Sequence, residues 1–253
     1  MSVKLNNFYN NKAIEILERL GCMTTIQYKQ DLSVMPNEAQ TKYYMSKMGC
    51  TSKQLVINLN GNGVTLQKGA MLWMAGQIEM TSGVKGAGDL VGKMFTSKVT
   101  GESAIKPEYK GIGVLCCEPT YKYLLLEDLA NWGGAVVIDD GLFCASDATV
   151  RHTVVSRNSI GTAALGGEGL FNLCLEGQGA VCLESKVPRE ELVEVILEND
   201  TIKIDGNFAI AWSKSLNFTV ERSSKSLLGS AASGEGLVNV YRGTGRILMM
   251  PGV

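Results

Sequence analysis

The stretch that decides the fold occurs three times in the chain. It reads GESAIKPEYKGIG at residues 101–113, GEGLFNLCLEGQG at 167–179 and GEGLVNVYRGTG at 234–245. Each copy begins with Gly-Glu and ends with a G-x-G pair, and the third copy is one residue shorter. Such recurrence at a fixed period indicates an internal repeat. The structural repeat positions are Gly101, Glu102, Gly111, Gly113, Gly167, Glu168, Gly177, Gly179, Gly234, Glu235, Gly243 and Gly245.

The repeat divides most of the chain into units of roughly 66 residues. We predict three pseudo-equivalent units inside a single β domain that covers residues 1–253. Residues 1–50 precede the units and are expected to form N-terminal strands and a short helix. The predicted units are residues 51–119, 120–187 and 188–253.

Hydrophobic residues inside the units alternate with a period of two, which is typical of β-strands. Ile202 and Ile204 follow this alternation, and Ile210 resumes it after Asp205-Gly206-Asn207, a sequence typical of a hairpin turn. Recurrent glycine marks bends and close backbone approaches in strands. The chain is therefore predicted to be all-β, as a closed barrel, a β-helix or a prism of three packed sheets. Repeats of this length exceed a solenoid rung, which favours the prism-like domain with three units.

The N-terminal segment carries two local predictions. Residues 37–48 follow Pro36 and place Tyr44 and Met48 four apart, which predicts a short helix near 37–48. Residues 11–20 fit a helix or a strand. We expect a strand, because Gly21 and the alternation at 24–28 suggest a hairpin.

Composition limits the classes of function. The chain has 253 residues, is 45% hydrophobic and has a formal net charge of −1, which excludes a disordered protein. Its 24 basic and 25 acidic residues argue against a nucleic-acid partner. The start lacks a signal-peptide pattern, and no uncharged stretch is long enough to span a membrane, so we expect a cytoplasmic protein.

Cysteine and histidine usage argues against an enzyme. The seven cysteines include no C-x-x-C and lie in apolar runs, so we expect buried thiols in a reducing compartment. The single histidine, His152, excludes sites that need two imidazoles, and no G-x-S-x-G motif occurs. Gly86 to Gly92 encloses five residues and Met94 follows Lys93, which departs from a phosphate-binding loop. We predict no catalytic residue, no cofactor and no metal site.

Residues 83–98 are predicted to be a contact segment. They begin with a glycine-rich lead-in and then place apolar groups on one side of a short helix with lysines beside it. The segment could dock on its own β domain, on a neighbouring subunit or on an anionic membrane, and these alternatives stay open. The candidate contact residues are Leu90, Val91, Lys93, Met94 and Phe95.

Several longer motifs resemble a known family. They read VKG at 84–86, GDL at 88–90, VTGES at 99–103, GLFNL at 169–173 and SAASGEGL at 230–237. They resemble the widespread bacterial family related to the fungal altered-inheritance-of-mitochondria biogenesis factor. The resemblance implies an all-β fold similar to the tryptophan RNA-binding attenuation protein, of the double-stranded β-helix kind. It supplies no catalytic residue.

Two classes of function remain open. The first is a non-catalytic assembly, scaffold or interaction protein, which would act near a membrane by analogy with the fungal relative. Its partner would be a second copy of itself (in a homo-oligomer) or a membrane surface. The alternative is an RNA- or small-ligand-binding module, which rests on fold similarity. Aromatic residues make up only 7% of the chain, which disfavours nucleic acid.

Overall fold

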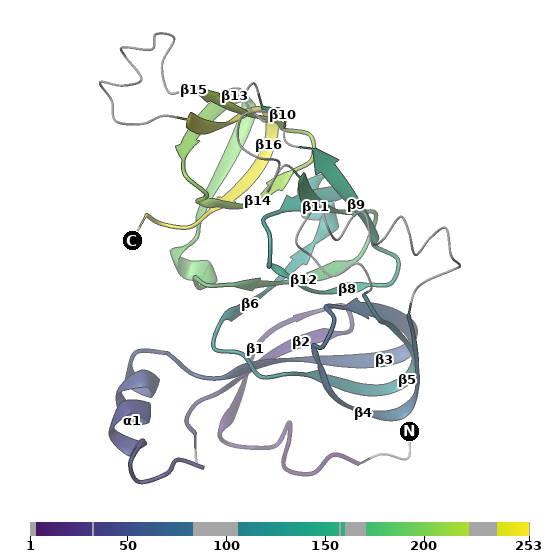
Figure 1. The fold of residues 1–253 in the computed structure, drawn as a ribbon. Coiled ribbons are helices and arrows are strands. Elements are labelled where there is room, and N and C mark those ends of the chain that lie inside the picture. The colour runs from purple at the N-terminus through teal and green to yellow at the C-terminus, as the bar shows by residue number, and fades with distance from the viewer. Residues whose placement is uncertain are drawn as a thin grey trace.

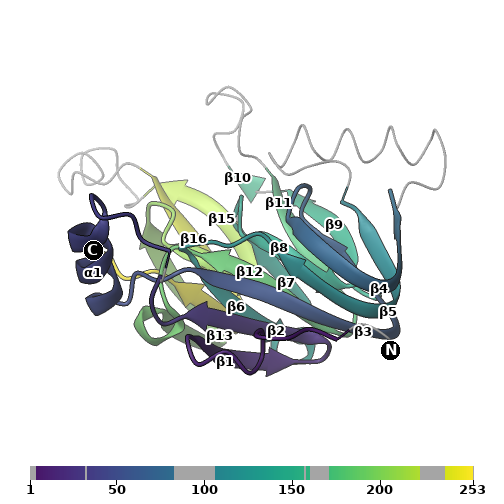
Figure 2. The same ribbon diagram turned by 90° about the horizontal axis from the view of Figure 1, so that it is seen from below.

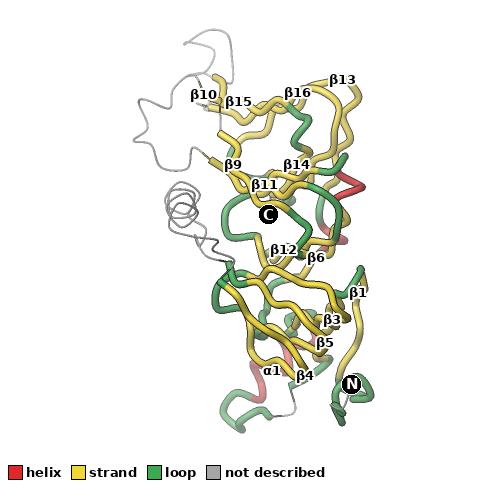
Figure 3. Tube along the Cα trace, turned by 90° about the vertical axis from the view of Figure 1, so that its right-hand side faces the viewer, coloured by secondary structure: helices red, strands yellow, loops and turns green. Residues whose placement is uncertain are grey.

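The computed structural model describes residues 4–31, 33–82, 106–156, 158–159, 171–222 and 237–252. These ranges are β-structure with one α-helix, α1 (Ala39–Lys47), so the all-β prediction and the short helix near 37–48 are confirmed. The strands form two curled sheets that lie one above the other (Figures 1 and 3). The contact residues of the 83–98 segment and the Gly-Glu positions of all three repeats lie outside the described residues.

Sheet A is the sheet nearer the N-terminus. Its strands are β1 (Ile14–Leu20), β2 (Met23–Tyr28), β3 (Lys53–Leu66), β4 (Met71–Thr81), β5 (Glu108–Cys117), β6 (Tyr123–Asp128), β8 (Phe143–Asp147) and β12 (Ala180–Ser185). Sheet B contains β7 (Ala135–Ile138), β9 (Arg151–Ser156), β10 (Asn158–Ser159), β11 (Phe171–Glu176), β13 (Val193–Asp205), β14 (Ala209–Ser213), β15 (Asn217–Arg222) and β16 (Leu237–Met249). Two 3₁₀ turns, η1 (Leu129–Trp132) and η3 (Arg189–Glu191), connect strands.

Strand pairing follows a common order along the chain, in which a later strand lies between two strands that precede it in sequence. β5 lies between β3 and β4, and β16 lies between β13 on one side and β14 and β15 on the other. In the middle of the chain, β12 lies between β6 and β8, while β11 lies between β7 and β9. Residues 120–187 therefore contribute strands to both sheets.

The hydrophobic core has a part inside each sheet and a part between them. Leu125 and Val181 of sheet A are buried together with Ile138 and Leu173 of sheet B, so the interface between the sheets is apolar. Cys116 and Cys117 belong to separate clusters on opposite faces of sheet A, as adjacent strand residues must.

The first G-x-G pair lies where two backbones approach closely. Gly113 is in the middle of β5, and a Cβ built there would lie 2.3 Å from the carbonyl oxygen of Ala75 on β4. The first glycine of each pair has a positive φ: 144° at Gly111, 117° at Gly177 and 120° at Gly243. This backbone conformation requires glycine, which explains the glycine at these positions.

The predicted N-terminal hairpin is confirmed, because β1 pairs antiparallel with β2 across Gly21. The hairpin predicted at 205–207 is wrong. A turn is present there, but in the described residues β13 and β14 pair with β16 and not with each other. The long strand β16 occupies the position between them.

Candidate functional site

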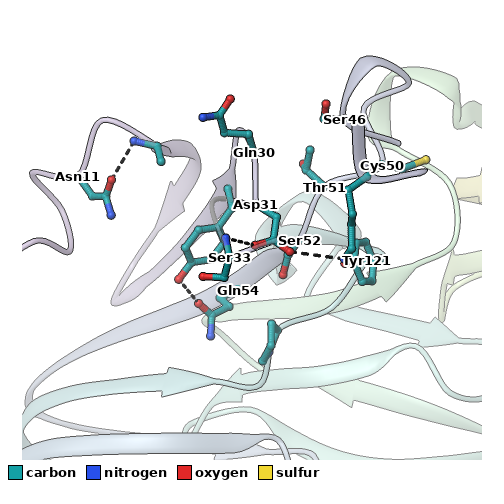
Figure 4. Close-up of a pocket in the computed structure, with 14 residues that line it drawn as sticks. Asn11, Gln30, Asp31, Ser33, Ser46, Cys50, Thr51, Ser52, Gln54 and Tyr121 are labelled. Carbon is teal, nitrogen blue, oxygen red and sulfur yellow. Dashed lines mark hydrogen bonds and ion pairs between the residues drawn. The ribbon is translucent and has the colours of Figure 1, made fainter. Parts of the chain in front are cut away.

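A cleft of about 530 Å³, lined mostly by polar residues, opens between α1 and the end of sheet A (Figure 4). Helix α1 stands off to the side of this sheet (Figures 1 and 2). Five stretches of chain contribute to the cleft: the loop before β1, the end of β2 and its following loop, α1, the approach to β3, and the loop after β5. The lining residues are Asn11, Ala13, Tyr28, Gln30, Asp31, Ser33, Lys42, Ser46, Cys50, Thr51, Ser52, Gln54, Pro119 and Tyr121.

Backbone hydrogen bonds hold these stretches together. The amide of Tyr28 donates to the carbonyl of Ser52 at 2.9 Å, which continues the β2–β3 pairing beyond the end of the strands. The amide of Lys29 donates to the carbonyl of Ala13 at 2.7 Å. The cleft is therefore supported by the ends of the sheet as well as by loop side chains.

A buried amide forms part of the cleft wall. The Nε2 of Gln54 donates to the carbonyl of Cys117 at 3.0 Å, and its Oε1 accepts from the Tyr28 hydroxyl at 2.6 Å. Burial raises the pKa of Tyr28, so this phenol remains a neutral donor. Both ends of the Gln54 side chain are thus committed to the protein.

One pair of opposite charges borders the cleft. Lys42 of α1 donates to the Tyr121 hydroxyl at 2.7 Å and lies 3.5 Å from a carboxylate oxygen of Asp31. The hydrogen bond to Tyr121, together with the charge of Asp31, raises the pKa of Lys42. The ammonium and the carboxylate offset each other, so the cleft carries little net charge.

Thr51 brings an unused polar group to the site. Its residue is 7% exposed, and its hydroxyl has no hydrogen-bond partner within the described part of the chain. Lys53, two residues further along the chain, is buried. Its Nζ donates to the Thr51 carbonyl at 2.9 Å and lies 4.2 Å from the centre of the Tyr123 ring. Burial lowers the pKa of Lys53. Lys53 therefore fixes the backbone of Thr51.

The two faces of α1 differ in character. Lys42 and Ser46, one turn apart, line the cleft. Tyr43 and Tyr44 are exposed at 57% and 59%, as is Met48 just after the helix at 78%, and none of the nine helix residues is buried. The helix is held by its connections and polar contacts, with little support from apolar packing.

The cleft is equipped to bind by hydrogen bonds. Within the described ranges, no group of three or more His, Cys, Asp or Glu side chains could hold a metal ion.

Cys50, at the rim of the cleft, is exposed, so the expectation that the cysteines are buried is wrong at this position. It precedes β3 in a connecting loop and lies outside any apolar run. The other six are buried or half-buried, and burial raises the pKa of Cys116 and Cys174 to about 12.

The lone histidine lies elsewhere and has partners. The Nε2 of His152 on β9 is 3.0 Å from the Ser146 hydroxyl, and its ring packs edge-on against Phe143. The cleft could not be predicted from the sequence, because its residues come from five separated stretches without a shared motif. No helix in the described residues is long and apolar enough to cross a bilayer.

Comparisons with known proteins agree with the observed β-structure. A model of the family described as mitochondrial biogenesis AIM24 matches residues 45–252. An uncharacterized protein from Streptococcus pyogenes serotype M6 is 29% identical over 196 residues, which cover 74% of this chain and 76% of that protein. A Streptococcus pyogenes protein of known crystal structure is 27% identical in sequence. The match covers 79% of this chain and 88% of that one, with a TM-score of 0.56.

Proposed function

The chain belongs to the mitochondrial biogenesis family AIM24, and on this premise we propose that it is a non-catalytic interaction protein whose cleft beside α1 holds a small ligand. The observation that carries the proposal is the cleft itself. Its volume of about 530 Å³ lies within the range of small-molecule pockets, and its walls are tied together by the ends of the sheet. The family match begins at residue 45, so much of the cleft wall precedes the matched residues.

A non-catalytic role is supported by the chemistry of the lining. Its charged groups, Asp31 and Lys42, offset each other, and its buried amide, Gln54, is fully engaged. The cytoplasm is the compartment we propose, because all seven cysteines are free thiols.

A blocked cleft tests the proposal. Ser33 is exposed and lines the cleft, so Ser33→Trp should fill it at little cost to folding, and Lys186→Trp places the same bulk on an exposed residue outside it. A thermal-shift screen against a panel of soluble metabolites should yield compounds that stabilise the wild type and Lys186→Trp but not Ser33→Trp. Compounds that stabilise all three proteins alike, or a panel without any binder, would refute the proposal.

Self-association is the second candidate, and it corresponds to an assembly role. Strand β4 pairs with β5 and with no other described strand, and it exposes Leu72, Met74 and Met80. An unpaired strand edge can pair with the same edge of a second copy. Light scattering should then give a dimer that Met74→Lys dissociates, whereas a monomeric wild type would exclude this candidate. Liposome and RNA co-sedimentation test the membrane and nucleic-acid alternatives.

The three-unit fold belongs to the same set of proposals. It is supported by the common pairing order, in which the last strand of each unit is central, and by the positive φ of Gly111, Gly177 and Gly243. Superposition of the units in an experimental structure tests it. Units that place these glycines at unrelated positions would exclude the double-stranded β-helix and prism-like descriptions alike.

A further inference from the structure

We infer that the cleft beside α1 binds a neutral, multiply hydroxylated ligand of the size of a mono- or disaccharide. This inference rests on the proposed binding function of the same cleft and adds the chemical class of the ligand. It follows from the charge balance, the hydrogen-bonding groups and the buried hydroxyl of the lining.

Charge balance excludes a strongly charged ligand. Among the described residues that line the cleft, Asp31 and Lys42 carry formal charges of opposite sign, 3.5 Å apart. Lys42 is further engaged by the Tyr121 hydroxyl. A phosphate or carboxylate would meet one ammonium already shared by two partners, and an amine would meet one carboxylate already paired. A neutral ligand incurs neither conflict.

The remaining polar groups match hydroxyls. Ser33, Ser52 and Thr51 bring side chains that both donate and accept, as sugar hydroxyls do. Gln30 adds an amide, which offers both kinds of group. The Ser46 hydroxyl donates to the Tyr43 carbonyl and can still accept, whereas both ends of the Asn11 amide are bonded to nearby backbone. Tyr28 and Tyr121 bring aromatic rings, whose apolar surface suits the C–H face of a sugar ring. Mixed donors and acceptors beside aromatic rings favour a polyhydroxylated molecule over an apolar one.

Thr51 marks the position where a ligand contact is most needed. Buried polar groups are nearly always hydrogen-bonded, and an exception needs an explanation. Thr51 lines the cleft, and its hydroxyl oxygen is buried just behind the cleft surface without a partner among the described residues, while Lys53 holds the backbone of the same residue in place. A ligand hydroxyl would supply the missing partner once rotation about χ1 of Thr51 turns this oxygen towards the cleft.

Thr25 provides a matched control. It lies on β2, is fully buried, and also has a hydroxyl without a partner in the described structure, but it does not line the cleft. Thr51→Val and Thr25→Val therefore make the same change of one hydroxyl to one methyl, inside and outside the proposed site. Both variants should keep or raise the melting temperature of the ligand-free protein, because each removes an unsatisfied buried polar group.

Isothermal titration calorimetry with defined probes tests the inference. The neutral probes are glucose, maltose and sucrose, and the charged counterparts are glucose 6-phosphate, gluconate and glucosamine. We expect at least one neutral probe to bind and every charged counterpart to bind at least tenfold more weakly. Thr51→Val should weaken binding of the neutral probe at least tenfold, and Thr25→Val should leave it unchanged.

The outcomes separate this inference from the function on which it rests. Charged probes that bind as well as neutral ones, or equal losses in the two threonine variants, would overturn the ligand class. If metabolites of another class bind the wild type and not Ser33→Trp while all the sugars fail, the ligand class is wrong and the cleft remains a binding site. If no compound distinguishes the wild type from Ser33→Trp, both proposals fail.

Discussion

Replacing Glu176 by glutamine should destabilise the protein at neutral pH and much less in acid. Glu176 ends β11 and is 8% exposed. Its Oε1 accepts from Lys214 at 2.5 Å and from the Thr153 hydroxyl at 2.7 Å, and its Oε2 accepts from Arg151. The hydrogen bond from Lys214, followed by those from Thr153 and Arg151, lowers the pKa of Glu176 from 4.5 to about 2.

The shift sets the size and the sign of the effect. At about 1.36 kcal/mol per pKa unit, ionised Glu176 contributes at most about 3.4 kcal/mol of folding free energy at neutral pH. Because the folded-state pKa is the lower one, the contribution is complete above pH 4.5 and is lost as the pH falls towards 2. At pH 3 roughly 1 kcal/mol remains. Solvent screening of the exposed Arg151 and Lys214 makes these values upper limits.

Urea unfolding of the wild type and Glu176→Gln at pH 7 and pH 3 measures this difference. The penalty of the substitution should be about 2 to 3 kcal/mol at pH 7 and should shrink by about 1 to 2 kcal/mol at pH 3. Glu184→Gln is the control, because the carboxylate that pairs with Lys122 is more exposed than that of Glu176, and its loss should cost less than about 1 kcal/mol. An equal penalty for Glu176→Gln at both pH values would refute the reasoning.

Three further perturbations follow from the packing. Gly113→Ala would place a Cβ 2.3 Å from the carbonyl oxygen of Ala75, so it should cost about 3 kcal/mol or more in urea unfolding; a change below about 1 kcal/mol would contradict this close approach. The buried carboxylate of Glu127 accepts from Arg189 at 2.8 Å. Arg189→Met removes this cation and should lower stability by about 2 kcal/mol in the same assay. An unchanged midpoint would count against that ion pair. A thiol reagent at pH 7 should label Cys50 alone within minutes, as mass spectrometry would report, and early labelling of any buried cysteine would be inconsistent with the structure.

The sequence predicted local secondary structure better than it predicted contacts between residues distant in the chain. Period-two alternation identified the strands, and Pro36 with the spacing of Tyr44 and Met48 identified α1, because these signals act over a few residues. The turn at 205–207 was also predicted, but its pairing was wrong, since β16 lies more than thirty residues away in sequence and separates β13 from β14.

The cleft could not be predicted for the same reason. Thr51 and Tyr121 are separated by more than one repeat, and only the folded sheet brings them to one cavity. The orphan hydroxyl of Thr51 has no signature in the sequence, because whether a hydroxyl is paired depends on the partners that tertiary structure supplies.

The sharing of residues 120–187 between the two sheets limits how the protein can be divided. β6 and β12 belong to sheet A, whereas β7 and β11, joined to them by short connections, belong to sheet B. Any cut within this stretch removes central strands from one sheet and leaves an apolar interface exposed on the other. Neither fragment would then be a self-sufficient folding unit, so the two sheets should melt in a single cooperative transition, and two co-expressed fragments should regain structure only by complementing each other.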